Sequence, residues 1–220
     1  MSTPKQASWI VKKIFDAREW LRQNNPTETL NNFCKKGKFC IKKVYTASRP
    51  KYQKCNWKRL TIASKAIPRH QFILWLALHR RLATVERLQK WGIVVSKDCV
   101  LCRSNAKETF DHLLFDCAYS RTMWSKILRW AEVKHQIGSW DEEISWIAKV
   151  AVNRSKGEIL AFLFTAVVYH VWNERNNRRF QGKEITCSKR IKEIIQMLHI
   201  RGQSVENWKK ELEQLNSYPS

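Results

Sequence analysis

The sequence predicts a mainly α protein, with a small zinc-stapled helical domain followed by a helical C-terminal region. Three observations support this prediction. Apolar residues recur at helical spacing along most of the chain, strand-like alternation is rare, and a Cys/His set near the middle has the spacing of a structural metal site. The 220 residues are 44% hydrophobic and include 11 Trp, enough for a packed core despite a net charge of +22.

The N-terminal part is expected to hold a helix, a polar loop and a strand that runs into a second helix. Residues 8–22 (SWIVKKIFDAREWLR) have apolar positions at helical spacing, and Ser8 is a suitable N-cap. Residues 24–32 are polar and contain Pro26, which indicates a loop. Residues 36–48 (KGKFCIKKVYTAS) alternate at first and then take helical spacing.

Two short helices are expected just before the Cys/His set. Pro68 suits the first turn of a helix through HQFILWLALHRR, because proline lacks the N–H that a first turn leaves unpaired. Thr84 begins a second helix over VERLQKW, and Gly92 ends it. Beyond them, a helix over 108–116 is expected to carry His112.

The next helices have recognisable starts. Ser120 is the expected cap of a helix over RTMWSKILRWAEV. Ser139 and Glu142 have capping-box spacing, as do Ser155 and Glu158, and they predict helices over about 140–152 and 156–178.

Helices over about 187–200 and 204–215 complete the chain, and the last has an apolar face of Val205, Trp208, Leu212 and Leu215. We therefore expect three regions. They are a basic N-terminal helix and linker (1–37), the zinc-binding domain (38–128) and a C-terminal helical region (129–220).

The Cys/His set consists of Cys99, Cys102, His112 and Cys117, with the spacing C-x2-C-x9-H-x4-C. Zn²⁺ prefers thiolate and imidazole ligands, and four protein ligands leave no open position for water or substrate. The prediction is therefore a structural zinc site. The alternatives are core thiols that meet by coincidence and a redox C-x-x-C, which here lacks the strand-to-helix context of thioredoxin-like motifs. Asp111 is either a partner of the His112 ring or, as we prefer, a solvated carboxylate.

The basic charge is concentrated ahead of this set, since residues 1–60 hold 15 Lys/Arg against 3 Asp/Glu. Such a block favours a polyanionic partner, because each phosphate neutralised releases a condensed counterion. A solvated basic surface, or a patch for anionic lipid or an acidic protein, is the alternative. Trp57 lies among basic residues, which suits base stacking beside phosphate contacts. The predicted nucleic-acid-binding residues are Lys35, Lys36, Lys38, Lys42, Lys43, Lys51, Lys54, Trp57, Lys58, Arg59, Arg69, Arg80 and Arg81.

The sequence indicates no enzymatic activity. The histidines outside the metal set are isolated, and six glycines are too few and too scattered for a phosphate-binding loop. Asp141, Glu142 and Glu143 are adjacent, but at a helix start they are more simply explained by the helix dipole.

No membrane partner is expected, because no apolar run approaches the roughly 18 residues of a spanning helix and no signal peptide is evident. The cysteines outside the metal set are scattered, which favours reduced thiols. The expected location is the nucleus or cytoplasm. A weak likeness of the basic N-terminus to a transit peptide makes organelle import the alternative.

Four segments together resemble a known family: KFCIKKVYTAS, WKRL, SKAIPRHQFILWLALHRRLATVERLQKWGI and DCVLCRSNAKETFDHLLFDCAYSRTMWSKI. They are similar to the zinc-binding domain that follows the reverse transcriptase in plant LINE-type non-LTR retrotransposons. The likeness covers about residues 38–128, and SWIVKKIFDARE and AVVYHVWNERNNRRF look like its flanks. It implies that the family's Cys, Cys, His and Cys correspond to Cys99, Cys102, His112 and Cys117. It also implies a region that helps to hold template RNA or target DNA while the polymerase primes synthesis.

The chain departs from such polyproteins in having no polymerase segment, endonuclease or ribonuclease H. The resemblance therefore implies a stand-alone fragment of an element or a host protein derived from one. The expected function is zinc-stabilised binding of RNA or DNA through the basic N-terminal third, within a larger ribonucleoprotein or polymerase assembly. One alternative is a structural subunit that uses its helices for protein contacts. Another is a non-functional translated relic, which predicts poor solubility and no stable zinc occupancy.

Overall fold

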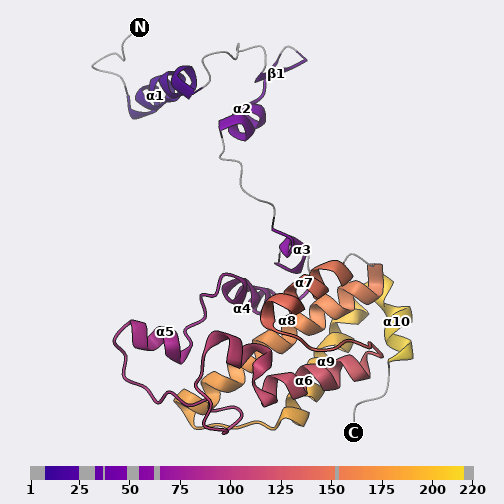
Figure 1. The fold of residues 1–220 in the computed structure, drawn as a ribbon. Coiled ribbons are helices and arrows are strands. Elements are labelled where there is room, and N and C mark those ends of the chain that lie inside the picture. Colours follow the sequence, from indigo (N-terminus) through magenta and orange to yellow (C-terminus); the bar gives the residue numbers. More distant parts are fainter. Residues whose placement is uncertain are drawn as a thin grey trace. The chain divides into compact units, whose positions relative to one another are not determined.

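The computed structural model describes residues 8–24, 33–36, 38–48, 55–61, 65–151 and 154–215. It is 68% helix and 3% strand, which confirms the predicted mainly α class (Figure 1). The chain forms two compact units, unit 1 (residues 1–54) and unit 2 (residues 55–220). None of the described helices is both long enough and apolar enough to cross a membrane.

Unit 1 holds a helix and a small hairpin that leads into a second helix. Its elements are α1 (Trp9–Asn24), β1 (Cys34–Lys35), β2 (Lys38–Phe39) and α2 (Ile41–Ser48), with the two strands antiparallel. The helix expected over 8–22 and the strand-to-helix segment over 36–48 are both confirmed. The loop expected over 24–32 lies outside the described residues apart from Asn24, which ends α1.

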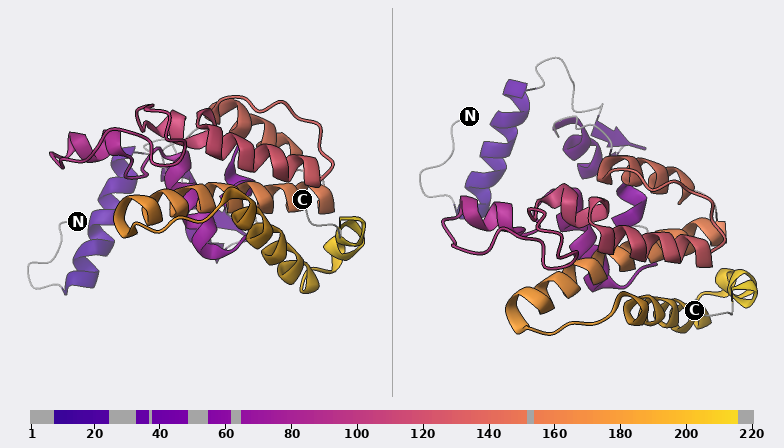
Figure 2. Two further views of the ribbon diagram at one scale, coloured as in Figure 1. Left: turned by 90° about the horizontal axis from the view of Figure 1, so that it is seen from below. Right: turned by 60° about the horizontal axis from the view of Figure 1, so that its bottom comes forward.

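Unit 2 is a helical bundle arranged around the long helix α8. The helix α8 contacts α4, α6, α7 and α9, and in Figures 1 and 2 it runs through the middle of this unit. Residues 159–168 of α8 are all buried, as expected of a helix that is apolar on every face. The elements of unit 2 are α3 (Lys58–Thr61), α4 (Pro68–Leu78), α5 (Val85–Lys90), the π-helical turn η2 (His112–Asp116), α6 (Ala118–Trp130), α7 (Trp140–Val150), α8 (Arg154–Asn176), the π-helical turn η3 (Asn177–Gln181), α9 (Cys187–Gln203), the 3-10 turn η4 (Glu206–Trp208) and α10 (Lys209–Gln214).

Aromatic rings from several of these helices form the centre of the core. The ring of Phe164 on α8 lies 5.7 Å from that of Phe115 and 5.5 Å from that of Trp124, measured between centroids. Trp140 stacks on Phe115 at 6.1 Å. These rings are almost fully buried, so the segment around the Cys/His set and the C-terminal helices share one core.

Several predicted helix starts are confirmed. Pro68 occupies the first turn of α4, Thr84 is the N-cap of α5, and Gly92 follows α5 with φ of 78°. Ser139 forms a full capping box with Glu142 at the start of α7. The apolar face expected near the C-terminus packs against the core: Val205, Trp208 and Leu212 are buried and Leu215 is half-buried.

Two predicted caps are wrong. The helix α6 begins at Ala118 with Cys117 as its N-cap, and the Ser120 hydroxyl instead accepts a hydrogen bond from the Phe115 N–H at 3.1 Å. Ser155 lies inside α8, which already begins at Arg154. The side chain of Glu158 is used elsewhere, because it accepts hydrogen bonds from Lys65 and from the indole N–H of Trp208.

The expected boundary between residues 128 and 129 falls inside α6. Leu128 and Trp130 are buried in the same continuous core, so the polypeptide on either side of this point packs together. By its contacts the chain divides after Lys54, and the three-region division stays a prediction.

Candidate metal centre

Cys99 and Cys102 lie on a short loop that is closed by backbone pairing. The Cys99 N–H donates to the Ala106 carbonyl at 2.8 Å, and Asp98 and Lys107 form an isolated β-bridge beside it. Two residues within the loop take left-handed φ angles of 54° and 55°, which turn the chain back on itself. Both thiols therefore face the same side of the loop.

His112 and Cys117 follow on a helical turn that breaks between them, so the continuous helix expected over 108–116 is wrong. In an unbroken helix, residues five apart project about 140° from each other and cannot face one ion. Phe115 takes φ of 81° and interrupts the helix, and α6 then begins with Cys117 as its N-cap. Thr109 supports the turn, because its hydroxyl accepts the N–H of His112 at 3.1 Å.

The four potential ligand atoms, three Sγ atoms and one imidazole nitrogen, lie close enough together to bind one zinc ion. All four lie within 4.8 Å of one another. The Sγ atoms of Cys99 and Cys117 are 3.9 Å apart, and Cys102 Sγ lies 3.4 Å from Nε2 of His112. Zinc bonds of ordinary length in a tetrahedron give S–S edges of about 3.8 Å and S–N edges of about 3.6 Å. The residues therefore fit Zn²⁺ as a four-coordinate ion with no open position.

The pKa values of the two buried thiols, Cys99 and Cys117, are shifted in opposite directions. The hydrogen bond with Cys117 lowers the pKa of Cys99 to about 5, and the same bond together with burial raises the pKa of Cys117. One thiolate is thus favoured by the protein alone. A bound cation would stabilise both thiolates, because metal binding displaces thiol protons.

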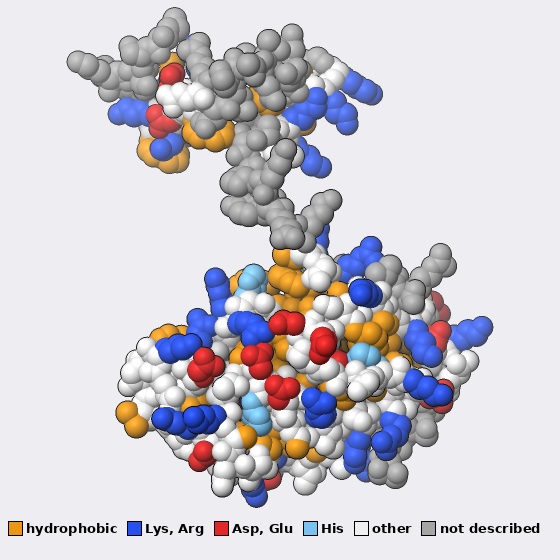
Figure 3. Space-filling model, in the orientation of Figure 1, with side chains coloured by type: hydrophobic (Ala, Val, Ile, Leu, Met, Phe, Trp, Pro, Cys, Tyr) orange, Lys and Arg blue, Asp and Glu red, His pale blue; other side chains and the backbone are white. Residues whose placement is uncertain are grey.

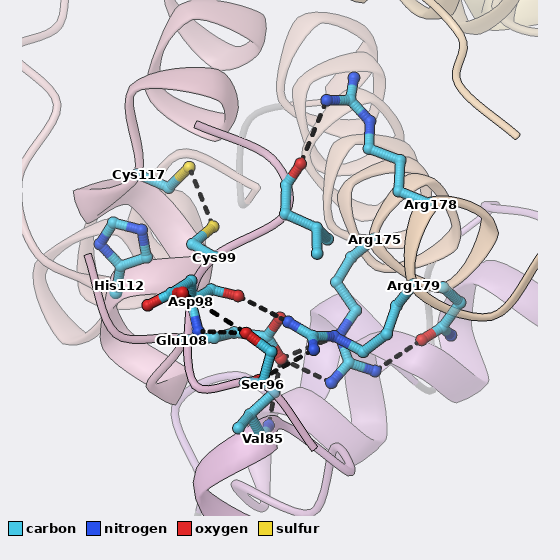
Figure 4. Close-up of polar contacts among 12 residues, drawn as sticks. Val85, Ser96, Asp98, Cys99, Glu108, His112, Cys117, Arg175, Arg178 and Arg179 are labelled. Carbon is cyan, nitrogen blue, oxygen red and sulfur yellow. Dashed lines mark hydrogen bonds and ion pairs between the residues drawn. The ribbon is translucent and has the colours of Figure 1, made fainter. Parts of the chain in front are cut away.

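A buried ion network that the sequence did not predict lies beside the metal-ligand set (Figure 4). The Glu108 carboxylate has no exposed surface. It accepts hydrogen bonds from Arg175 Nε at 2.8 Å, from Arg179 at 2.9 Å and from the Val85 N–H at 3.1 Å. A buried carboxylate needs such partners, because an unpaired one is strongly disfavoured in the interior.

The turn η3, which directly follows α8, holds the loop that carries the first two cysteines. Arg179 donates to the carbonyls of Ser96 at 3.0 Å and Asp98 at 2.7 Å. Arg178 donates to the carbonyls of Val100 and Leu101, at 3.3 Å each. We call Arg175, Arg178 and Arg179 the arginine clamp. Their spacing of three and four residues, at the end of an otherwise apolar helix, is the signal from which this clamp could have been predicted.

Asp111 is directed to an arginine rather than to the imidazole of His112. Its carboxylate accepts a hydrogen bond from Arg80 at 2.8 Å, and 55% of its side chain is exposed. The preferred interpretation as a surface carboxylate therefore agrees with its position, with an ion pair added.

Glu143 differs from its two acidic neighbours. Glu142 caps α7 and Asp141 lies in its exposed first turn, as a role in the helix dipole predicts. Glu143 is fully buried instead and accepts hydrogen bonds from the Trp124 indole at 2.8 Å and from the Gly138 N–H at 2.9 Å. It is a core residue of α7, and its hydrogen bond with Trp124 links α7 to α6.

The predicted nucleic-acid-binding residues are divided between the two units. In unit 1, Lys35, Lys36, Lys38 and Lys42 are exposed on the hairpin and α2. Lys43 is also exposed, but its ammonium donates to the Cys34 carbonyl at 2.7 Å. Lys51 and Lys54 lie outside the described residues.

In unit 2, Lys58 and Arg59 are exposed on α3, and Trp57 is half-buried with its ring against His79. Arg69 lies over the ring of Tyr169, with its guanidinium carbon 5.4 Å from the centroid. Arg81 lies 6.0 Å from the centroid of Trp75.

Arg80 is paired with two carboxylates. Its guanidinium donates to Asp111 at 2.8 Å and to Asp141 at 3.0 Å, and it covers the ring of Phe110 at 4.8 Å. Binding a phosphate would require it to give up these carboxylates, so we leave Arg80 out of the binding surface proposed below.

Comparison with known proteins identifies one family. A family model described as zinc-binding in reverse transcriptase matches residues 39–124, a segment that contains all four metal-ligand residues as well as α4 and α5. This region is an accessory part of reverse transcriptases rather than the catalytic part. No curated protein and no solved structure matches the chain.

Proposed function

Residues 39–124 are a zinc-binding domain of the reverse-transcriptase family, and on this premise we propose that the chain is a zinc-stabilised nucleic-acid-binding protein. Zn²⁺ held by Cys99, Cys102, His112 and Cys117 would fix the loop and the start of α6 against the core. The basic hairpin and α2 of unit 1, with α3 of unit 2, would contact phosphates. The closed ligand set supports a structural ion, since it offers no position for a reacting water.

The observation that carries this proposal is the density of exposed lysines on unit 1. Residues 33–48 contain five Lys and no Asp or Glu, and all five side chains are exposed. Clustered positive charge costs self-repulsion in the free protein, and a polyanion relieves it while releasing counterions.

The test is a titration of the zinc-loaded protein with duplex DNA and with structured RNA at several salt concentrations. We expect submicromolar binding that weakens steeply with salt, with a log–log slope of about 0.7–0.9 per phosphate contacted. Replacing Lys35, Lys38 and Lys42 together by Gln should reduce that slope by about 2 to 3. Replacing Lys90, Lys183 and Lys209 by Gln removes the same charge from exposed positions of unit 2 and is the matched control.

The proposal fails if binding is weak, does not distinguish the polymers and disappears near physiological salt. It also fails if the two triple variants lose affinity equally, since net charge rather than a surface would then explain the binding.

A structural subunit of a larger assembly is the second candidate, and one observation favours it. The segment that ends α5 exposes three neighbouring apolar side chains: Trp91 is 55% exposed, Ile93 47% and Val94 98%. Exposed apolar residues in sequence suit a protein partner. Docking through them would respond little to salt, which separates this function from phosphate binding.

The origin rests on the sequence resemblance, and we propose that it lies in a plant LINE-type element. We propose RNA or DNA as the polymer within a larger ribonucleoprotein or polymerase assembly, and a nuclear or cytoplasmic location. The titration above shows which polymer is preferred.

A further inference from the structure

Four aromatic rings form a continuous row on the surface of unit 2. Phe72 and Trp75 stack with centroids 6.2 Å apart and planes 16° from parallel. Trp75 meets His79 at 4.7 Å, and His79 meets Trp57 at 5.4 Å, both edge to face. We call Phe72, Trp75, His79 and Trp57 the aromatic row.

The row lies on the outer face of α4. Positions 72, 75 and 79 are three and four residues apart, the spacing that places side chains on one side of a helix. Phe72 is 58% exposed and Trp75 37%, whereas Leu74 and Ala77 on the opposite face are fully buried. Core packing therefore does not account for the exposed faces of Phe72 and Trp75, whereas Trp57 is half-buried against the core.

Cations accompany the aromatic row. The guanidinium of Arg81 lies over Trp75, and Lys58 and Arg59 follow Trp57 directly and are exposed. Residues 55–98 hold nine Lys/Arg against two Asp/Glu. Hydrophobic and basic side chains lie side by side over α4 and α5 in the space-filling view (Figure 3). A neutral protein partner would have to desolvate these charges, whereas a polyanion pairs with them.

We propose that the aromatic row is a stacking platform for the bases of single-stranded nucleic acid. This inference rests on the proposed function and specifies its polymer. Aromatic faces stack with any unpaired base, while flanking cations hold the backbone, so such a surface binds single strands with little sequence preference. The bases of a duplex are stacked on one another and cannot use it. Duplex binding would depend on the exposed cations alone, which are the lysines of unit 1 together with Lys58 and Arg59.

The test compares an unstructured oligouridylate with a DNA duplex of the same length. Phe72→Ala combined with Trp75→Leu removes two ring faces while keeping much of the apolar surface, and both positions are exposed enough to tolerate the change. We expect oligouridylate affinity to fall about ten- to a hundredfold and duplex affinity to stay unchanged.

Trp75→Phe keeps a ring face and should retain most of the affinity. Trp91→Ala is the matched control, because Trp91 is also an exposed indole with an arginine, Arg87, lying over its ring. Circular dichroism and zinc content confirm that each variant is folded.

The possible failures can be told apart. Unchanged oligouridylate affinity in the double variant, with duplex binding intact, overturns the stacking platform and leaves the proposed function standing. An equal loss for both polymers, or an equal loss in Trp91→Ala, also overturns it, because the effect would not be specific to stacking on this row. Failure of the unaltered protein to bind either polymer contradicts the proposed function and this inference together.

Discussion

Cys117 combines two roles at one position. Its buried thiol is one of the four proposed metal ligands, and its backbone occupies the N-cap position of α6. We expect Cys117→Ser to remove stoichiometric zinc and to lower the free energy of unfolding by about 3 kcal/mol or more, since structural zinc binding energy is also folding energy. Zinc content by atomic absorption and urea unfolding measure the two effects. Cys55→Ser, at an exposed thiol, should stay within about 0.5 kcal/mol of the unaltered protein. Unchanged zinc content in Cys117→Ser would contradict the ligand assignment.

A single substitution at Glu108 tests the buried ion network. Glu108→Gln keeps the shape of the side chain but leaves Arg175 and Arg179, which are 1% and 7% exposed, without their countercharge. Removing one partner of a buried ion pair is strongly destabilising, so we expect a loss of about 3 kcal/mol in urea unfolding. Glu206→Gln breaks an ion pair with Lys209 in which the glutamate is 86% exposed, and its effect should be below about 1 kcal/mol. Similar losses in both variants would mean that the network around Glu108 contributes no more than a surface pair.

At the scale of elements, the contact between α4 and α8 contains two buried imidazoles. His70 stacks on Tyr169 at 4.0 Å and meets His170 edge to face at 5.7 Å. No hydrogen-bond partner for either ring is found among the described residues. Burial and, to a smaller extent, the charge of Arg69 lower the pKa of His70 to about 4. Burial and, to a smaller extent, the neighbouring His70 lower the pKa of His170 to about 3.

The stability of this contact should therefore depend on pH. In the unfolded chain both imidazoles take up protons near their ordinary pKa of about 6.5, so protonation favours unfolding as the pH falls from there toward 4. Each histidine adds a slope of up to about 1.4 kcal/mol per pH unit. We expect His170→Phe to show a smaller loss of stability than the unaltered protein between about pH 7 and pH 5, measured by urea unfolding. The comparison between His170→Phe and the unaltered protein cancels any proton-linked release of zinc that the two have in common. An unaltered slope in His170→Phe would contradict this account.

Local chemistry explains which elements the sequence predicts and which it does not. Pro68, Thr84 and the Ser139–Glu142 box act on their own helix ends, so their effects can be read from neighbouring residues. Ser155 and Ser120 have equally good local patterns, but tertiary contacts decide their roles: α8 begins one residue earlier, and Ser120 supports the strained Phe115. The convergence of Cys99, Cys102, His112 and Cys117 was predictable because their spacing is a property of the chain. The arginine clamp was not identified, because a basic helix end is usually solvated and only the fold brings Glu108 to it.

At the scale of the whole molecule, residues 55–128 and the C-terminal helices belong to one compact unit and share one core. Phe115 and Trp124 pack on Phe164, and the carbonyls of the loop that carries Cys99 are held by Arg178 and Arg179 of η3, which follows α8. A fragment of residues 38–128, which follows the sequence resemblance, would expose these aromatic rings and leave Glu108 without its arginines. Burial of large aromatic side chains and pairing of a buried carboxylate each contribute several kcal/mol, comparable to the whole stability of a domain.

We therefore expect the fragment 38–128 to bind zinc weakly and to lack a cooperative unfolding transition, whereas residues 55–220 should keep both zinc and cooperative thermal unfolding. Zinc content after dialysis against a chelator, together with calorimetry, compares the two. Residues 55–220 also lack the lysines of the hairpin and α2 but retain the aromatic row, so they should bind oligouridylate more weakly than the full chain yet still better than duplex DNA. A stably folded, zinc-loaded fragment 38–128 would contradict the dependence on α8. It would mean that the metal alone, and not the shared core, holds the loop and the start of α6 in place.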